Sequence, residues 1–181
     1  MNSAQHSSKS NEHYTPHEVI QAAQATMGGI DLDPASCETA NSVVRAAQYF
    51  GKEQDGLSVP WYGTVFLNPP GSKIRGKSAA AVWWSKLVSE WQIGNVSEAI
   101  FVGFSIEILQ TTQRAGGPVP LDFPFCVPAA RLDFLGEDLK EQGSPTHANV
   151  IVYLPPKASV AAGITRFRRE FAHMGRGVVP T

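Results

Sequence analysis

Several features that would identify a membrane, secreted or metal-binding protein are missing from these 181 residues. No run of about 18 apolar residues occurs, so no membrane-spanning helix is expected. The polar start lacks the basic and then apolar layout of a signal peptide, so we expect a cytoplasmic protein. The two cysteines, Cys37 and Cys126, lack metal-ligand spacing, which favours a reducing compartment and no metal site.

The sequence also has no G-x-G-x-x-G run, which argues against a nicotinamide cofactor. The net charge is −1, so charge alone neither requires nor excludes a nucleic acid partner. With 43% hydrophobic and 17% charged residues, the chain has the composition of a globular protein rather than a disordered one. Its length fits one domain, expected at residues 12–175 between a flexible tail at 1–11 and a C-terminal tail at 176–181.

The most informative stretch surrounds two consecutive prolines, Pro69 and Pro70. Residues 64–67 have strand character and run straight into Asn68 and this proline pair. Neither proline can continue a strand or a helix, and each restricts the residue before it to extended geometry. We therefore expect a stiff turn at the carboxyl end of a buried strand, which is where open α/β sheets bind their ligands.

This turn offers two hydrogen-bond acceptors, the side-chain carbonyl of Asn68 and the backbone carbonyl of Pro69. Two neighbouring acceptors suit a planar amino group, which carries two donors. Methylation of an aromatic amine needs such contacts because the nitrogen lone pair is delocalised into the ring, and placed acceptors localise it without a general base. A turn that only caps a strand would also explain Asn-Pro-Pro, and this alternative stays open.

An acidic segment precedes the turn. Residues 30–36 alternate like a short strand and then place an acid, a proline and small residues at its carboxyl end. Small residues let a ligand approach the backbone, and an acid pairs with ammonium or hydroxyl donors. The alternative is a turn with an aspartate cap. The candidate ligand-binding residues are Asp31, Asp33, Pro34, Ala35 and Ser36.

The first helix is expected to begin at Tyr14-Thr15-Pro16. Thr15 as N-cap, Pro16 at the first helical position and Glu18 three residues after the cap form a predicted capping box, and Gly28-Gly29 ends the helix. Tyr14, Thr15 and Pro16 either serve only this helix start or also contact a cofactor.

Taken in order, Tyr-Thr-Pro at 14–16, Ile-Asp-Leu-Asp-Pro-Ala-Ser at 30–36, Asp55-Gly56-Leu57 and Leu-Asn-Pro-Pro at 67–70 resemble the bacteriophage-type DNA adenine methyltransferase (Dam-like) family. The resemblance covers about residues 12–156. It implies S-adenosylmethionine as cofactor, with Asp33 and Pro34 at its methionine part and Asp55 at its adenine amine. The fourth motif position, normally an aromatic that stacks on the target base, is Gly71 here.

The same resemblance implies DNA as partner and the 6-amino group of a flipped adenine as methyl acceptor, with Asn68, Pro69 and Pro70 as the catalytic turn. It also implies a phage or prophage protein in a bacterial cytoplasm. Two alternatives remain: a methyltransferase for another planar amine, in RNA, cytosine or protein glutamine, and a non-catalytic DNA-binding protein on the same scaffold. A monomer is favoured.

A basic segment follows the turn at residues 71–77 and contains Lys73, Arg75 and Lys77. Three positive charges suit DNA phosphates, although a solvated flexible loop would have the same composition. Arg131 is a further candidate for phosphate or cofactor carboxylate, or else a partner of Asp133. Because the chain leaves no room for a separate recognition domain, sequence choice is expected to depend on loops 71–77 and 136–147.

The sequence as a whole predicts an α/β fold, an abbreviated Rossmann-like S-adenosylmethionine-dependent methyltransferase domain with a mixed, mainly parallel sheet and helices on both faces. Adjacent Trp83 and Trp84 cannot share a helix face, so one is expected in the core and the other half-buried or in place of the missing aromatic. The expected helices are 38–42, 78–93, 106–113 and 159–173, an extended piece is expected near 43–49, and the expected further strands are 99–104, 125–127, 131–134 and 149–154.

Overall fold

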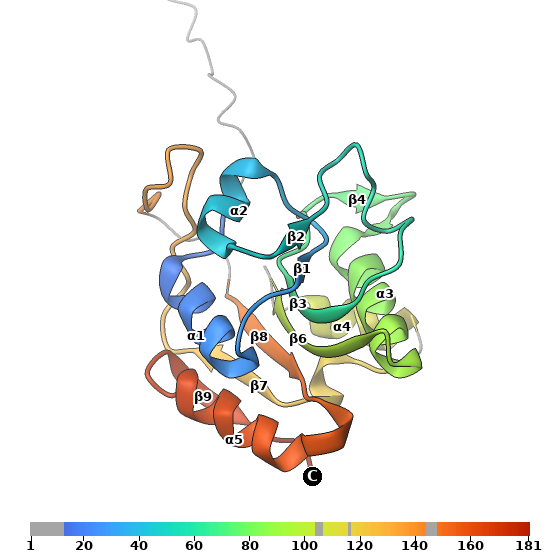
Figure 1. The fold of residues 1–181 in the computed structure, drawn as a ribbon, viewed down its shortest axis with the longest axis vertical. Coiled ribbons are helices and arrows are strands. Elements are labelled where there is room, and N and C mark those ends of the chain that lie inside the picture. Colours follow the sequence, from blue (N-terminus) through green and yellow to red (C-terminus); the bar gives the residue numbers. More distant parts are fainter. Residues whose placement is uncertain (1–12, 104–106, 116, 144–147) are drawn as a thin grey trace, which may run out of the picture.

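The computed structural model describes residues 13–103, 107–115, 117–143 and 148–181. Within these ranges a seven-stranded sheet crosses the molecule in the order β2-β1-β3-β6-β8-β7-β9 (Figure 1). A separate two-stranded hairpin is formed by β4 (Lys73–Ile74) and β5 (Lys77–Ser78). The strands of the large sheet are β1 (Leu32–Asp33), β2 (Gln48–Tyr49), β3 (Gly63–Leu67), β6 (Val96–Gly103), β7 (Phe125–Pro128), β8 (Val150–Leu154) and β9 (Gly175–Val178).

Most strands of the sheet point the same way. Strands β2, β1, β3 and β6 pair in parallel, β8 is antiparallel to β6, and β7 is antiparallel to β8. The edge strand β9 is antiparallel to β7. Five strands therefore share one direction and β8 and β9 oppose it, within the described part of the chain. The predicted α/β class with a mixed, mainly parallel sheet is confirmed.

Helices cover both faces of the sheet, as predicted. Helices α1 (His17–Met27), α2 (Glu38–Val44) and α5 (Val160–Glu170) pack on one face, and α3 (Ala79–Ile93) and α4 (Glu107–Ala115) pack on the other. Short 3-10 turns occur at Pro120–Asp122 and Lys157–Ser159.

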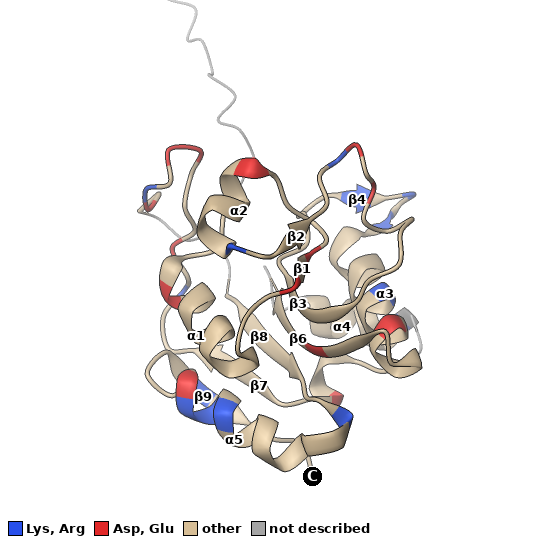
Figure 2. Cartoon of the chain, in the orientation of Figure 1, with Lys and Arg blue, Asp and Glu red and all other residues tan. Residues whose placement is uncertain are grey.

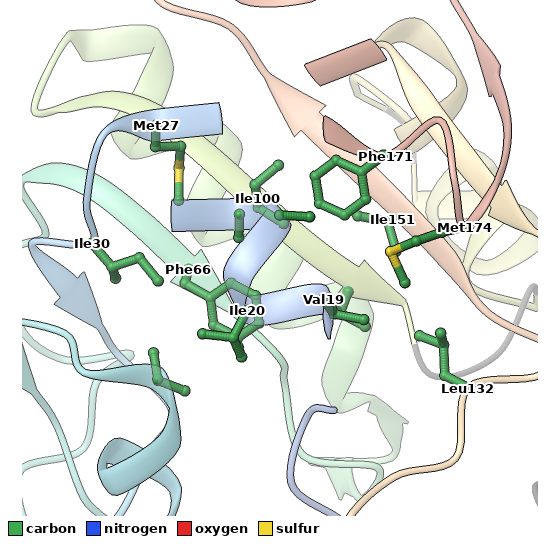
Figure 3. Close-up of a cluster of buried hydrophobic side chains, with 14 of the residues drawn as sticks. Val19, Ile20, Met27, Ile30, Phe66, Ile100, Leu132, Ile151, Phe171 and Met174 are labelled. Carbon is green, nitrogen blue, oxygen red and sulfur yellow. The ribbon is translucent and has the colours of Figure 1, made fainter. Parts of the chain in front are cut away.

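Alternation along the central strands produces the two cores. Phe66, Ile100 and Ile151 point to the face of α1 and α5, where they meet Val19, Ile20 and Phe171 (Figure 3). Their neighbours Val65, Leu67 and Phe101 point to the opposite face, against α3 and α4. Successive strand residues face opposite sides, so a strand covered by helices on both faces must be apolar throughout. This explains the unbroken apolar runs in β3 and β6.

The order in which strands are added to the sheet reverses at β1, although β1 and β3 are parallel. From β1 the chain passes through α2 to β2 on one side, whereas β3 and β6 lie on the other side of β1. Open α/β sheets bind ligands outside the carboxyl ends of the strands at such a reversal. Asp33 ends β1 and Asn68 directly follows β3, so both residues lie at this point.

The prediction that Thr15 caps the first helix is wrong. Helix α1 begins at His17, with Pro16 as N-cap and no side-chain capping bond. Tyr14 exchanges two backbone hydrogen bonds with Leu135, at 2.9 and 2.8 Å, which holds the chain extended up to the proline. The residue before a proline also disfavours helical geometry, so Thr15 stays outside the cap. The predicted end is confirmed, because Gly28 adopts a left-handed φ of 80°.

Other predicted boundaries were also wrong. Helix α2 continues to Val44 and ends at Arg45 in left-handed geometry, so only residues 48–49 of the extended piece at 43–49 form a strand. Residues 131–134 form no strand, because β7 ends at Pro128 and the Leu132 N–H donates to the Asn149 side chain instead of to a neighbouring strand.

The chain ends also differ from expectation. The predicted tail at 176–181 is wrong for residues 176–178, which belong to β9 and pair with β7. The predicted tail at 1–11 lies outside the described residues, as does Ser144–His147 within loop 136–147. No helix in the described part of the chain is long and apolar enough to cross a membrane.

A buried polar network lies near the amino end of β6. The Tyr153 hydroxyl and the Arg166 guanidinium both donate to Glu98, the latter at 3.1 Å, and Arg166 Nε donates to the Thr26 carbonyl at 2.7 Å. Glu98 is 6% exposed and Tyr153 fully buried. Arg166 therefore anchors α5 to the sheet and to α1.

We expect Tyr153→Phe to lower the free energy of unfolding by about 2 kcal/mol, because a buried hydrogen bond to a carboxylate is lost. Tyr62→Phe is the matched control, since its hydroxyl donates to Gln48 at 2.6 Å on a surface where Tyr62 is 44% exposed. Urea denaturation of both variants measures the difference. Equal losses would show that the network adds nothing beyond a surface hydroxyl.

Candidate functional site

Asn68 is held in one orientation at the end of β3. Its Nδ2 donates to the His13 carbonyl at 3.2 Å, so its Oδ1 remains as an acceptor. Pro69 is buried and Pro70 exposed. No donor among the described residues reaches the Pro69 carbonyl. Both oxygens of this turn therefore remain available as acceptors within the described part of the chain.

The segment before α1 connects this turn with the turn after β1. His13 holds Asn68, and the hydroxyl of the next residue, Tyr14, accepts a hydrogen bond from Cys37 Sγ at 3.7 Å. Cys37 directly follows Ser36. Tyr14, Thr15 and Pro16 are buried, so much of their surface serves packing. The structure thus brings Tyr14 to the acidic segment.

Asp33 is a buried carboxyl with a raised pKa. It is 4% exposed, and burial raises its pKa to about 7, although hydrogen bonds from the Ser36 side chain and the Ala35 N–H oppose this rise. The Ala35 N–H reaches Asp33 Oδ1 at 3.2 Å. A buried carboxyl without a cationic partner at the end of a strand is typical of a binding site for a positive ligand group.

The loop of Asp55 lies directly on the turn that follows Asp33. A Cβ placed on Gly56 would be 2.0 Å from the Pro34 carbonyl oxygen, so only glycine allows this approach. Asp55 itself has a positive φ of 47°, is exposed, and accepts a hydrogen bond from the Ser58 hydroxyl. The structure therefore brings together Pro34 and Asp55, which are 21 positions apart in the sequence.

Two tryptophans, Trp61 and Trp83, pack against this loop. The Trp61 indole donates to the Gly56 carbonyl at 2.7 Å and stacks on Trp83, with ring centroids 5.9 Å apart. Trp83 and Trp84 are both buried, at 6% and 1% exposure, so the expectation that one is half-buried is wrong. Trp84 packs against the sheet, whereas Trp83 faces the 56–61 loop, which covers it. Trp83 therefore does not replace the missing aromatic.

The basic segment after the turn is ordered rather than a loose loop. Strands β4 and β5 form a two-residue hairpin whose central residues, Arg75 and Gly76, have φ of 48° and 79°. Positive φ at both positions matches the twist of a hairpin. Lys73, Arg75 and Lys77 are exposed, and their hairpin lies at the same end of the molecule as α2 (Figure 2). The Ser72 carbonyl accepts from the Ala79 N–H at 2.9 Å, which fixes the hairpin to α3.

Asp31 and Arg131, two further predicted site residues, lie at opposite edges of the sheet. Asp31 lies at the amino end of β3, where its Oδ2 accepts from the Thr64 N–H at 2.8 Å, so the structure does not bring it to Asn68. Arg131 is exposed beside Leu132, whose N–H is held by Asn149, and Asn149 also donates to the Gly103 carbonyl. Arg131 therefore lies near the carboxyl end of β6, at the same edge of the sheet as Asn68.

Sequence reasoning missed the His13 carbonyl, the Gly56 contact and the Trp61–Trp83 pair. The Asp-Gly-Leu motif indicated Asp55 as a site residue. In the structure it is the neighbouring Gly56 that cannot carry a side chain, because of its contact with Pro34. No group of three His, Cys, Asp or Glu side chains among the described residues could hold a metal ion. Both cysteines are free, and burial raises the pKa of Cys126 to about 11.

Comparisons of the chain with protein-family models, with curated proteins and with solved structures gave no match.

Proposed function

We propose that this protein is a Rossmann-like methyltransferase that transfers a methyl group from S-adenosylmethionine to the 6-amino group of adenine in DNA. The observation that carries this proposal is the position of Asn68 and Asp33 at the ends of neighbouring parallel strands, at the point where the strand order reverses. Asn68, together with the Pro69 carbonyl, offers acceptors for an amine. Asp33 offers a buried carboxyl for a cation.

The residues present fit this cofactor. Asp33 and Pro34 would hold the methionine part, whose ammonium suits a buried carboxyl, and Asp55 would accept from the adenine amine. Gly56 lies so close to Pro34 that no side chain fits between the two segments, and this contact holds the loop of Asp55 beside the turn of Asp33. When bound, S-adenosylmethionine supplies an electrophilic methyl group on a sulfonium.

The chain's own part in the reaction is positioning. Asn68 Oδ1 and the Pro69 carbonyl accept the two hydrogens of the target amine, which localises the nitrogen lone pair for attack. The His13 carbonyl fixes the Asn68 amide, so the acceptors are placed before the base arrives. Water takes the released proton, and no general base is needed.

The aromatic that the family motif carries after its second proline is missing, and position 71 is exposed. A Cβ on Gly71 would meet nothing within 4 Å, and its φ is not among the positive values. The open side of this position leaves room for the flipped base to be stacked by another group. The proposal therefore requires no side chain at position 71.

The test is expression of the protein in cells free of DNA methylation, followed by mass spectrometry of their hydrolysed DNA, RNA and protein. N6-methyladenine in DNA is the expected product. Modified cytosine, RNA or protein glutamine would move the assignment to another planar amine. Calorimetry with S-adenosylmethionine separates the non-catalytic alternative, because absence of binding would favour a DNA-binding protein on this scaffold.

The hairpin supplies the DNA contacts in this proposal. Lys73, Arg75 and Lys77 carry three positive charges within five residues, and no acid lies among them. We expect replacement of all three by glutamine to reduce the slope of log K against log salt by up to about 2.7, since each lost duplex phosphate contact contributes about 0.9. Fluorescence anisotropy of a labelled duplex, measured over a salt series, gives this slope.

The matched control replaces Arg168, Arg169 and Arg176 by glutamine. These residues belong to α5 and β9, at the opposite end of the molecule from the hairpin. Their loss removes the same charge, so a general charge effect would change the slope equally in both variants. An equal change would therefore remove the hairpin from the DNA interface.

A further inference from the structure

The hairpin of β4 and β5 is an ordered element beside the proposed catalytic turn. Only Gly71 and Ser72 lie between the Asn-Pro-Pro turn and the first strand of the hairpin. The Ala79 N–H donates to the Ser72 carbonyl at 2.9 Å, and Ile74 packs against the core on the α3 side of the sheet. These contacts fix the base of the hairpin, whereas its two-residue tip is exposed.

The three cations occupy different places on this hairpin. Lys73 pairs with Ser78 across the ladder and Lys77 pairs with Ile74, so the two lysines lie on opposite faces. Arg75 lies at the tip, between the two strands. Among the described residues, none of the three cations takes part in an ion pair. A positive charge on each face and one at the tip suit a groove that has phosphates on both sides and bases at its floor.

Arginine is an unusual residue at this tip. Arg75 occupies the first central position of the turn with a φ of 48°, a geometry that asparagine, aspartate and glycine adopt most readily. The requirements of the turn therefore do not explain this arginine. A guanidinium offers two parallel donors that match the acceptors O6 and N7 on the major-groove edge of guanine, which is the commonest base-specific contact of arginine.

The size of the hairpin matches the major groove of DNA. Each strand has two residues, so at about 3.4 Å per residue the hairpin rises about 7 Å above its base. The major groove is about 8.5 Å deep and admits a two-stranded ribbon, whereas the minor groove is only about 6 Å wide. In the major groove the side chain at the tip reaches the base edges, and the two lysines stay near the phosphates.

We infer that Arg75 contacts a guanine in the major groove beside the target adenine, and that Lys73 and Lys77 contact the phosphates on either side of that groove. This inference depends on the proposed function, which puts the adenine at Asn68. Arg75 follows Asn68 by seven residues, which span at most about 25 Å. At about 3.4 Å per base pair, the guanine lies within roughly seven base pairs of the methylated adenine.

The first test compares the sequence around each methylated adenine. The natural protein and Arg75→Asn are expressed in cells free of DNA methylation, and the modified bases are located by sequencing. We expect a fixed guanine within roughly seven base pairs for the natural protein, and loss of selection at that position alone in Arg75→Asn. This variant contains Asn-Gly, the pair preferred in such a turn, so the hairpin stays folded and the urea midpoint should not fall.

The second test measures the same contact without turnover. Fluorescence anisotropy compares duplexes that carry guanine or 7-deazaguanine at that position, since the analogue lacks the N7 acceptor. We expect the natural protein to bind the 7-deazaguanine duplex roughly fivefold more weakly and Arg75→Asn to bind both equally. Lys73→Gln is the matched control from the same hairpin. It should weaken both duplexes by the same factor and reduce the slope of log K against log salt by about 0.9.

The outcomes distinguish this inference from the function on which it depends. If the DNA of the cells contains no N6-methyladenine, the proposed function fails and this inference fails with it. If adenine is methylated without a fixed guanine nearby, or if Arg75→Asn still selects that guanine, the inference is overturned while the function stands. A loss of affinity in Arg75→Asn that is equal for all sequences would also overturn it, because Arg75 would then contact a phosphate.

Discussion

Replacement of Asn68 by alanine should reduce methyl transfer roughly 100- to 1,000-fold, the range observed when one placed dipole is removed from an active site. The affinity for S-adenosylmethionine should stay nearly unchanged, because the residues proposed to hold this cofactor lie at the end of β1 and on the loop of Asp55. Single-turnover transfer of a labelled methyl group to adenine-containing DNA measures the rate, and calorimetry measures the affinity. Retained activity would overturn the assignment of the Asn-Pro-Pro turn.

A second variant separates chemistry from anchoring. Asn68 both offers Oδ1 to the amine and donates from Nδ2 to the His13 carbonyl. Asn68→Asp keeps an acceptor and loses the donor, so it should retain more of the rate than Asn68→Ala. Equal losses would mean that the anchoring of His13, rather than the acceptor, supports catalysis. Gln21→Ala, on the exposed surface of α1, controls for handling and folding.

Replacement of Asp33 by asparagine should stabilise the free protein by up to about 4 kcal/mol above pH 7, since each pKa unit corresponds to about 1.4 kcal/mol. The pKa of Asp33 is about 7 in the folded chain and 3.8 in the reference state. Between these values the folded state binds the proton and the unfolded state does not, so the stability of the natural protein falls as pH rises from about 4 to about 7. The asparagine variant lacks this loss.

The measurement is urea denaturation of both proteins across that pH range. The stability difference should be small near pH 4, grow up to about pH 7 and remain constant above it. A difference that does not change with pH would show that Asp33 is not buried as a neutral acid. Glu53→Gln is the control, because it removes one carboxylate at an exposed position.

Asp33→Asn should also lower the affinity for S-adenosylmethionine, because the ammonium group of the cofactor would lose the carboxylate that pairs with it. In the natural protein the affinity should rise with pH up to about 7, by at most tenfold per unit, because the cation binds the ionised form of Asp33. Together the two results describe a residue that costs stability in the free protein and contributes to binding, a common exchange at functional sites.

The sequence by itself determined the α/β class, the central strands and the stiff turn. The apolar runs in β3 and β6 are long enough to reveal strands that are buried on both faces. The two prolines end β3 for a covalent reason, since proline has no N–H and a fixed φ. These features are local, and neighbouring residues decide them.

The tertiary structure decided the helix start at His17, the absence of a strand at 131–134 and the pairing of β9. Each of these depends on a contact distant in sequence: Tyr14 with Leu135, Leu132 with Asn149, and Gly175 with Pro128. No local pattern encodes such contacts. The same holds for the site, where Gly56 meets Pro34 and Asn68 is held by His13, because packing between separate elements alone brings these groups together.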